Sequence, residues 1–335
     1  MKNFWHTLPK PLFVLAPMAD VTDVAFRRII AKYGKPDVTW TEFVSADGLA
    51  RAPEEGKKKL LKDLEYSEAE RPIVAQLFSG TPKNMEYAAR LCKELGFDGI
   101  DINMGCPDRS IEKQGAGAAH IKNPEVAQEV IYAAQQGAAG LPVSVKTRLG
   151  YNKDELDTWL PKLFETKPAA VTVHARTRKE MSKVPARWER VAYAVRMRDE
   201  LAPEVLILGN GDVLDIEDAR HKIEESGADG AMLGRAIFGN PWLFSSLKYR
   251  DEWKDQKLMM YHQVPTLEEK LRVMVEHTAL FEELLPEKNF ALMKKHYKAY
   301  VHGFDGASDL RQRLMQAENA HEVGEITEQF LGLTS

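Results

Sequence analysis

The chain has 335 residues, of which 44% are hydrophobic and 29% charged, and its 46 Lys and Arg against 50 Asp and Glu give a net charge of −4. This composition argues against disordered and fibrous proteins, and the charge argues against a globally basic nucleic-acid-binding protein, so any polyanion site must be a local patch. The length suits a domain of about 250 residues and a smaller second domain.

Secretion, membrane insertion and disulfide bonding are not expected. The opening residues MKNFWHTLPKP lack the apolar core and small-residue cleavage site of a signal peptide. No run approaches the roughly 18 to 20 apolar residues that span a bilayer. Two cysteines, Cys92 and Cys106, are too few for a disulfide framework or a zinc cluster. We therefore expect a cytoplasmic protein that binds no metal and has no membrane or obligate protein partner.

Short β-branched runs alternate with amphipathic helical patterns along most of the chain. We predict eight strands, at residues 12–18, 38–43, 72–78, 99–105, 142–149, 169–176, 205–212 and 230–238. Helical patterns between them include residues 84–97, 124–137, 156–166 and 216–227. Eight strand-helix units over about 240 residues predict a (β/α)8 barrel, the TIM barrel fold. An open doubly wound sheet is the alternative, but no GxGxxG motif follows the first strand.

The carboxyl ends of barrel strands carry the active site, and here they hold polar and glycine residues. These are Met18 and Ala19, Gln76, Asn103 and Cys106, Lys146 and Arg148, His174 and Arg176, Asn210, Gly211 and Asp212, and Gly234 and Arg235. The glycines of GNGD and LGRA have no side chain to cover the backbone N–H groups after the seventh and eighth strands, where barrels bind phosphate. Each glycine pair alone could simply make a tight turn, but together they favour a phosphate.

Three polar residues inside apolar strands suit a flavin. Lys146 must meet an anion or an acceptor, because an unpaired buried ammonium is costly. A salt bridge inside the barrel is one interpretation, and the electron-rich edge of a reduced flavin explains the lysine better. His174 would bind the phosphate or ring edge of the same cofactor, or be structural. Gln76 would bind the pyrimidine edge, or make an ordinary interior hydrogen bond.

The two cysteines have different surroundings. Cys92 lies among apolar residues at helical spacing and is predicted to pack in the core. Cys106 follows an apolar run and begins a glycine-rich loop, so its thiol is displayed at the barrel mouth. A thiol with an ordinary pKa of about 8.5 is mostly protonated at neutral pH, and it can give a proton as well as attack.

Several segments, in order, resemble the tRNA-dihydrouridine synthase family. They are APMADVTDVAFRR at 16–28, DINMGCP at 101–107, QGAGAA at 114–119, SVKTRLG at 144–150, VTVHART at 171–177, GNGDV at 209–213 and GADGAMLGRAIFGNPWLF at 227–244. NMGCP followed by GAGAA is specific, whereas GNGD also occurs in other flavin barrels. Asp20 departs from the pattern, because a glycine is frequent at its place.

The resemblance implies an FMN enzyme that reduces the C5=C6 bond of selected uridines in tRNA with electrons from NADPH. Cys106 would protonate C5 while the flavin N5 delivers hydride to C6. The FMN would be held by Pro17, Met18, Ala19, Gln76, Lys146, His174, Asn210, Gly211, Asp212, Gly234 and Arg235. The tRNA would be met by Asn103, Arg148, Arg176, Arg178, Lys294, Lys295 and Lys298.

Beyond about residue 245 helical patterns follow one another without strands. We predict an FMN-binding barrel domain at 1–245, a connecting segment at 246–264 and a helical domain at 265–335, which resembles the family's tRNA-binding domain. Between residues 288 and 313, six Lys and Arg stand against two Asp, with His296, Tyr297 and Tyr300 interleaved. This stretch is a phosphate-facing patch or a solvated helix face.

Two other functions stay open. One is a flavin barrel that acts on a free pyrimidine, as dihydroorotate and dihydropyrimidine dehydrogenases do, and the basic helical stretch argues against it. The other is a catalytically silent RNA-binding protein, and the polar strand ends argue against that. Loss of dihydrouridine from tRNA when the gene is deleted would separate the tRNA enzyme from both.

Overall fold

A computed structural model describes residues 3–254 and 265–332 of the chain. Part of the predicted connecting segment, residues 255–264, therefore lies outside the described residues. The chain divides into two compact units, Met1–Ala19 with Asp37–Arg235, and Asp20–Pro36 with Ala236–Ser335. The predicted domain boundary at residue 245 falls within the second unit.

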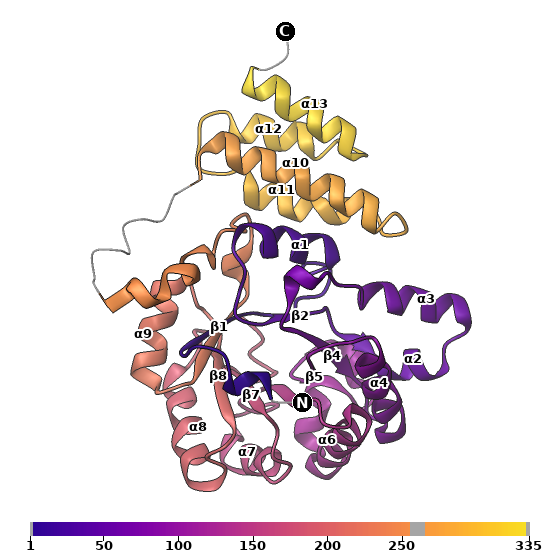
Figure 1. The fold of residues 1–335 in the computed structure, drawn as a ribbon, viewed down its shortest axis with the longest axis vertical. Helices are drawn as coiled ribbons and strands as arrows, with labels where there is room; N and C mark the ends of the chain where they lie inside the picture. Colours follow the sequence, from indigo (N-terminus) through magenta and orange to yellow (C-terminus); the bar gives the residue numbers. More distant parts are fainter. Residues whose placement is uncertain (1–2, 255–264, 333–335) are drawn as a thin grey trace. The chain divides into compact units, whose positions relative to one another are not determined.

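The first unit is built on a sheet of nine short parallel strands (Figure 1). They are β1 Leu12–Leu15, β2 Thr39–Trp40, β3 Val44–Ser45, β4 Ile73–Phe78, β5 Gly99–Met104, β6 Val143–Arg148, β7 Ala170–His174, β8 Leu206–Asn210 and β9 Gly230–Leu233. Their order is β1-β9-β8-β7-β6-β5-β4-β2, with β3 paired to β4. A parallel bridge between Val14 and Val38 brings the two ends of the sheet together. The ring is nearly closed, which confirms the predicted barrel.

All eight predicted strands are shorter in the structure, and the second and the last differ most. The run 38–43 contains only β2, which ends at Trp40, and β3 begins beyond the run at Val44. Between them the Thr41 hydroxyl accepts the Gln76 N–H at 3.1 Å and donates to the Glu42 carbonyl at 2.8 Å, so side-chain hydrogen bonds interrupt the regular strand. The last run ends at Leu233, after which residues 235–237 form a 3-10 helix, η4 Arg235–Ile237.

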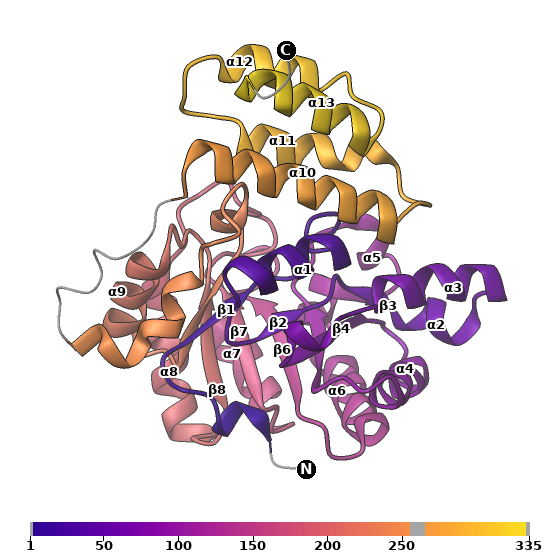
Figure 2. The ribbon, with the colours of Figure 1, turned by 45° about the horizontal axis from the view of Figure 1, so that its top comes forward.

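Helices surround the strands of the first unit (Figure 2). They are α2 Ala46–Arg51, α3 Glu54–Asp63, α4 Pro82–Glu94, α5 Arg109–Glu112, α6 Pro124–Ala138, α7 Leu156–Phe164, α8 Trp188–Leu201 and α9 Ile216–Ser226, with the 3-10 helices η1 Phe4–His6, η2 Glu68–Glu70 and η3 Gly117–Lys122. The four predicted helical patterns correspond to α4, α6, α7 and α9. Cys92 on α4 is 0% exposed, which confirms its predicted place in the core.

The interior of the barrel changes from apolar to polar along the strands. Apolar side chains fill the end where the strands begin, among them Trp5, Leu12, Val14, Trp40, Val74, Ala170, Leu206, Leu208 and Met232. Alternate residues nearer the carboxyl ends are polar, as the sequence predicts. Because neighbouring strands run parallel, these polar side chains gather at one mouth of the barrel.

Helices are the only regular elements among the described residues of the second unit. Its elements are α1 Val24–Tyr33, η5 Ser245–Lys254, α10 Leu267–Leu284, η7 Phe290–Met293, α11 Lys294–Tyr300, α12 Ala307–Leu314 and α13 Ala320–Leu331. Helix α1 follows β1 in the chain but packs against α10 of the second unit. The Tyr33 hydroxyl donates to Glu276 of α10 at 2.6 Å, and Phe26 stacks on His277 with ring centroids 4.7 Å apart. None of the described helices has the length and apolarity needed to cross a bilayer.

Candidate active site

Polar side chains stand next to one another on neighbouring strands at the barrel mouth. The strand register pairs Gln76 with Asp101, Asn103 with Lys146, Arg148 with His174, and His174 with Asn210. Paired residues of parallel strands lie side by side. The structure therefore brings together six side chains that the sequence singles out, from strands far apart in the chain.

Lys146 reaches the mouth without an anionic hydrogen-bond partner among the described residues. Its Nζ donates to Asn210 Oδ1 at 3.3 Å, and Asn210 Nδ2 donates to the Met232 carbonyl at 2.8 Å. Burial, reinforced by the charge of Arg148, lowers the pKa of Lys146 to about 8. An ammonium whose acceptor is neutral favours an anionic ligand as its next partner.

His174 lies within a group of cations. Burial and the charges of Arg148, Lys146, Arg176 and Arg235 hold the pKa of His174 well below its usual value, so the imidazole is neutral at pH 7. It can therefore accept a hydrogen bond at one ring nitrogen and donate one from the other. The excess of positive charge around it matches a phosphate or another anionic group.

The loops after β8 and β9 contribute backbone and charge to the mouth. Gly211 has φ of 120°, and a Cβ there would lie 2.9 Å from the Ala186 Cβ, so this position requires glycine. Asp212 pairs with Arg176 and, at 2.6 Å, with Arg235, and its hydrogen bond with Arg176 lowers its pKa. Arg235 itself is exposed, so its guanidinium can also take an anionic ligand.

The glycine after β9 lies next to the end of β1. A Cβ on Gly234 would lie 3.6 Å from both Met18 Sδ and the Ala16 Cβ. Pro17 and Met18 come after Ala16, which follows β1, and Ala19 after them is exposed. The predicted first and last strand ends are therefore neighbours, as a closed barrel requires.

Two arginines of the predicted tRNA contact hold loops inside the protein. Arg148 Nε donates to the Gly105 carbonyl at 2.7 Å, and one of its terminal nitrogens donates to the Met181 carbonyl at 3.0 Å. Arg176 Nε donates to the Val184 carbonyl at 2.5 Å. Both side chains are buried, so they contribute charge to the site and order to its rim. Their contact with tRNA stays a prediction.

Arg178 ties α5 to the cysteine loop. It pairs with Glu112 through two hydrogen bonds, of which that from Nε is 2.6 Å long. It also donates to the Pro107 carbonyl at 3.4 Å and lies over the Tyr151 ring at 5.1 Å. The residue therefore contacts the loop at Pro107, next to Cys106 in the chain, and its contact with tRNA stays a prediction.

Cys106 is half-buried just beyond the end of β5, on a loop that is held from both sides. Its N–H donates to Asn103 Oδ1 at 2.9 Å, and its carbonyl accepts from the Ala118 N–H at 2.9 Å. Gly117 allows this approach, because a Cβ there would lie 2.8 Å from the Cys106 carbonyl oxygen. Burial raises the pKa of the Cys106 thiol, which is therefore protonated at neutral pH and suited to giving a proton.

Asp101 is a polar residue of the site that the sequence analysis does not single out. Its carboxylate accepts hydrogen bonds from Gln76 on β4 and Ser144 on β6. The signal for it lies in GIDINM, where a carboxylate alternates with isoleucines inside a buried strand. A charge at such a position needs partners, and one of them, Gln76, is a predicted site residue.

The basic stretch of the second unit is only partly as predicted. Lys298 on α11 is exposed, and Lys294 and Lys295 are half-buried. The aromatic residues predicted to face phosphates between them are instead core residues, since His296, Tyr297 and Tyr300 are 1%, 0% and 2% exposed. The helical period puts them on the face opposite the lysines, so their predicted role is wrong.

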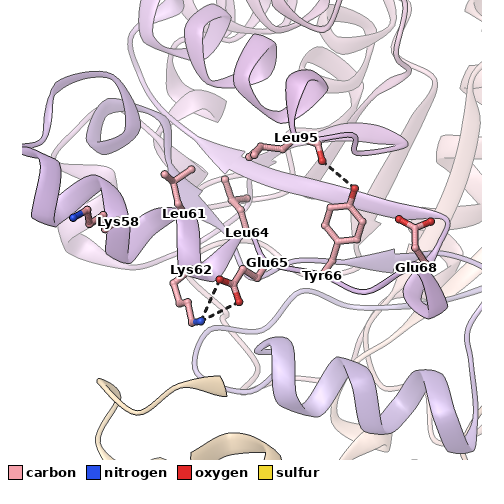
Figure 3. Close-up of a pocket in the computed structure, with 8 residues that line it drawn as sticks. All are labelled: Lys58, Leu61, Lys62, Leu64, Glu65, Tyr66, Glu68 and Leu95. Carbon is pink, nitrogen blue, oxygen red and sulfur yellow. Dashed lines mark hydrogen bonds and ion pairs between the residues drawn. The ribbon is translucent and has the colours of Figure 1, made fainter. Parts of the chain in front are cut away.

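An open hollow lies elsewhere on the first unit (Figure 3). It is lined by Lys58, Leu61, Lys62, Leu64, Glu65, Tyr66, Glu68 and Leu95. Lys62 pairs with Glu65 at 3.1 Å, and the Tyr66 hydroxyl donates to the Leu95 carbonyl at 3.0 Å. Two lysines balance two glutamates, and none of the predicted site residues lines this hollow. The candidate site is therefore the barrel mouth.

Within residues 3–254 and 265–332 no three His, Cys, Asp or Glu side chains are grouped as a metal ion would need. The chemistry at the mouth is instead that of a thiol, three neutral amides and a surplus of cations. These groups can give a proton, orient a heterocycle by its edge and bind an anion.

Comparisons of the sequence give one family. The model of dihydrouridine synthase (Dus) matches residues 14–333. A probable tRNA-dihydrouridine synthase of Staphylococcus aureus is 39% identical over 332 residues, which cover 98% of this chain and 96% of that protein. Probable tRNA-dihydrouridine synthase 2 of Bacillus subtilis is 40% identical over 332 residues, which cover 98% of this chain and 97% of that protein.

Solved structures share the barrel at low sequence identity. Morphinone reductase in complex with tetrahydroNAD superimposes with a TM-score of 0.51 at 14% identity, over 72% of this chain and 87% of that chain. 2-Naphthoyl-CoA reductase gives a TM-score of 0.54 at 12% identity, over 71% of this chain and 50% of that chain. At these identities the likeness concerns the fold alone.

Proposed function

The chain belongs to the dihydrouridine synthase family, and from this premise we propose that it is a tRNA-dihydrouridine synthase, which reduces the C5=C6 bond of specific uridines in tRNA. FMN is the bound cofactor and NADPH the electron donor of this proposal. The observation that carries it is the half-buried Cys106 thiol, whose pKa is raised by burial, next to a mouth lined with cations. Two relatives whose names carry the same activity support it.

The donor set of the mouth fits a flavin mononucleotide. Lys146 and Gln76 would contact the polar edge of the ring, where a reduced flavin carries negative charge. Pro17, Met18 and Ala19 would lie against the ring. The ring edge, ribityl chain and phosphate would be held by His174, Asn210, Gly211, Asp212, Gly234 and Arg235. When bound, the flavin supplies a hydride for C6 of the uracil ring.

Cys106 supplies the proton for C5. Addition at C6 leaves negative charge on C5 and O4, so the S–H bond breaks as the C5–H bond forms, and a thiolate remains. Burial raises the pKa of Cys106, and the charges of Arg148 and Lys146 oppose that rise. The same cations stabilise the thiolate until water returns the proton.

The target uridine must leave the RNA stack to reach the barrel mouth. Asn103, Arg148, Arg176 and Arg178 would meet the extruded nucleotide. We assign catalysis to the barrel domain and binding of the tRNA to the helical domain, with Lys294, Lys295 and Lys298 facing phosphates. The proposal places this reaction in the cytoplasm.

The purified full-length protein is expected to be yellow, to absorb near about 450 nm and to release FMN on denaturation. With NADPH it is expected to form dihydrouridine in tRNA purified from a strain that lacks the modification. The measurement is mass spectrometry of the digested tRNA, with heat-inactivated protein as the control. A colourless protein that takes up no FMN contradicts the cofactor, and a flavoprotein that reduces a free pyrimidine but no tRNA favours the alternative substrate.

Charge reversal on α11 is expected to weaken tRNA binding without changing the flavin content. Lys294 and Lys298 are four residues apart and share a helix face, so Lys294→Glu with Lys298→Glu removes two neighbouring phosphate contacts. The slope of log K against log salt should fall by about 2, and the affinity at low salt by about tenfold. Filter binding at several salt concentrations measures both.

The matched control for these lysines is Lys167→Glu, which reverses an exposed charge just before β7, at the end of the barrel opposite the mouth. It should leave the salt slope unchanged. Equal tRNA affinity in the wild type and the α11 variant would assign these two lysines to a solvated helix face.

A further inference from the structure

A buried carboxylate, Asp101, lies on the interior face of β5, two residues before Asn103. The residue is 1% exposed. One carboxyl oxygen accepts from Gln76 Nε2 at 2.6 Å, and the other accepts from Ser144 Oγ at 2.6 Å. Burial raises the pKa of Asp101 to about 6, whereas these hydrogen bonds and the charge of Lys146 lower it. At neutral pH the group is mostly an anion, and its hydrogen bonds are charge-assisted.

Asp101 is connected to the cysteine loop through two side-chain amides. Gln76 Oε1 accepts from Asn103 Nδ2 at 3.2 Å. Asn103 Oδ1 accepts from the backbone N–H groups of Gly105 at 3.2 Å and Cys106 at 2.9 Å. A carboxylate only accepts and a backbone N–H only donates, so both ends of this chain impose the same orientation on the two amides between them.

We propose that Asp101 is a positioning residue for Cys106, because its carboxylate orients the Gln76 and Asn103 amides so that Asn103 Oδ1 holds the N–H groups of the cysteine loop. With the amides reversed, Asn103 Nδ2 would face two N–H donors, and the loop would lose both hydrogen bonds. This inference rests on the proposed role of Cys106 as the proton donor and adds a residue that acts on the thiol from a distance.

Asp101 has a second partner, and that partner provides a matched control. Ser144 donates to the carboxyl oxygen of Asp101 that Gln76 does not use, and it takes no part in the chain of amides. Ser144→Ala therefore removes one hydrogen bond from Asp101 and leaves the chain complete. Asp101→Asn keeps the shape of the side chain but can present an N–H group to Gln76, so the amides are no longer held in one orientation.

Hydrogen exchange of the Gly105 and Cys106 amides in the full-length protein, without tRNA, measures the hold on the loop. We expect exchange about tenfold faster in Asp101→Asn, since the loss of the anion frees both amides to turn. Ser144→Ala should stay within about twofold of the wild type. Mass spectrometry of short overlapping peptides reads the rates.

Alkylation of the thiol with iodoacetamide provides a second measurement on the same proteins. Cys106 should react about threefold faster or more in Asp101→Asn, because a loosened loop exposes Sγ. Cys92 is fully buried and stays unmodified while the protein is folded, so it serves as an internal control. If Cys92 reacts, Asp101→Asn has unfolded, and Gln76→Met is used in its place. This variant removes the amide between Asp101 and Asn103, so the Gly105 and Cys106 amides should exchange as fast as expected for Asp101→Asn.

Unchanged exchange and alkylation in folded Asp101→Asn or Gln76→Met would overturn the inference, and so would an equal increase in Ser144→Ala. Neither measurement needs tRNA or turnover. If the protein formed no dihydrouridine, the proposed function would fail while these results would still decide whether Asp101 positions the loop.

Discussion

Replacing Cys106 with alanine is expected to slow uridine reduction in tRNA by about 10²- to 10⁴-fold, the range typical of a lost general acid. The thiol contacts a small apolar cluster formed with Phe78 and Ile111, and alanine is tolerated there without a polar group being left unpaired. None of the groups proposed to hold the flavin is removed. The variant should therefore keep its flavin and the reduction of that flavin by NADPH while tRNA turnover collapses.

The matched control is Cys92→Ala, which removes the other thiol from a buried position on α4. It should cost stability through a small cavity and leave the rate of tRNA reduction nearly unchanged. Single-turnover reduction of tRNA by prereduced protein separates the two effects from flavin reduction. Turnover of tRNA at the wild-type rate in Cys106→Ala would remove the thiol from its proposed role.

The barrel and its polar mouth follow from local patterns that the sequence displays directly. The strands are short apolar runs, and seven of the eight predicted ones carry polar or glycine residues at the carboxyl end. Lys146 and Gln76 are conspicuous because polar side chains interrupt apolar strands. These features need no knowledge of which strand pairs with which.

The pairing of groups could not be predicted, because it depends on strand register. Asp101 becomes a site residue only once β5 lies between Gln76 of β4 and Ser144 of β6. The same holds for α1, whose packing with α10 through Phe26 and His277 is invisible in a helix pattern that directly follows the first strand. Long-range contacts of this kind leave no local trace in the sequence.

The burial of the aromatic residues on α11 could have been predicted from the spacing of residues in the sequence. From residue 293 to 300 the lysines and the buried aromatic residues fall on opposite faces at a period of 3.6. The departure from the family pattern at Asp20 also has a structural explanation. The φ of Asp20 is 55°, which lies in the left-handed region. Glycine adopts this conformation freely and aspartate tolerates it, which accounts for glycine being frequent at this place in the family.

Acidification is expected to destabilise the second unit through two buried histidines. His277 and His296 lie with ring centroids 4.7 Å apart, and neither nitrogen of either ring has a hydrogen-bond partner among the described residues. Phe26 and Phe238 stack on them. Burial lowers the pKa of His277 well below its usual value and that of His296 to about 3, and each also has a nearby basic residue that adds to the effect.

The sign of the effect follows from where the protons bind. Below an ordinary histidine pKa of about 6.5 the unfolded chain binds a proton at each imidazole, whereas the folded protein does not. The contribution of the two neutral histidines to the free energy of unfolding is therefore fully present above that pH, and it is lost as the pH falls toward the folded pKa values. Between about pH 7 and about pH 5 the loss is about 2 kcal/mol for each histidine, or about 4 kcal/mol for the pair.

Urea unfolding of the full-length protein at both pH values, followed by circular dichroism, measures this loss. His277→Phe with His296→Phe keeps aromatic packing and removes both titrating groups, so it should lose about 4 kcal/mol less than the wild type on acidification. Other groups, such as buried Asp23, are present in every variant and cancel in the difference.

Tyr300→Phe is the matched control, because it removes a buried hydroxyl from the same core, in which the Tyr300 and His277 ring centroids lie 6.1 Å apart. Burial raises the pKa of Tyr300, so this group carries no charge in acid and its removal should leave the acid loss as it is in the wild type. An equal acid loss in the wild type and the double histidine variant would mean that other groups carry the pH dependence. If the double histidine variant loses less stability on acidification and Tyr300→Phe does not, the two histidines are the groups whose protonation destabilises the second unit.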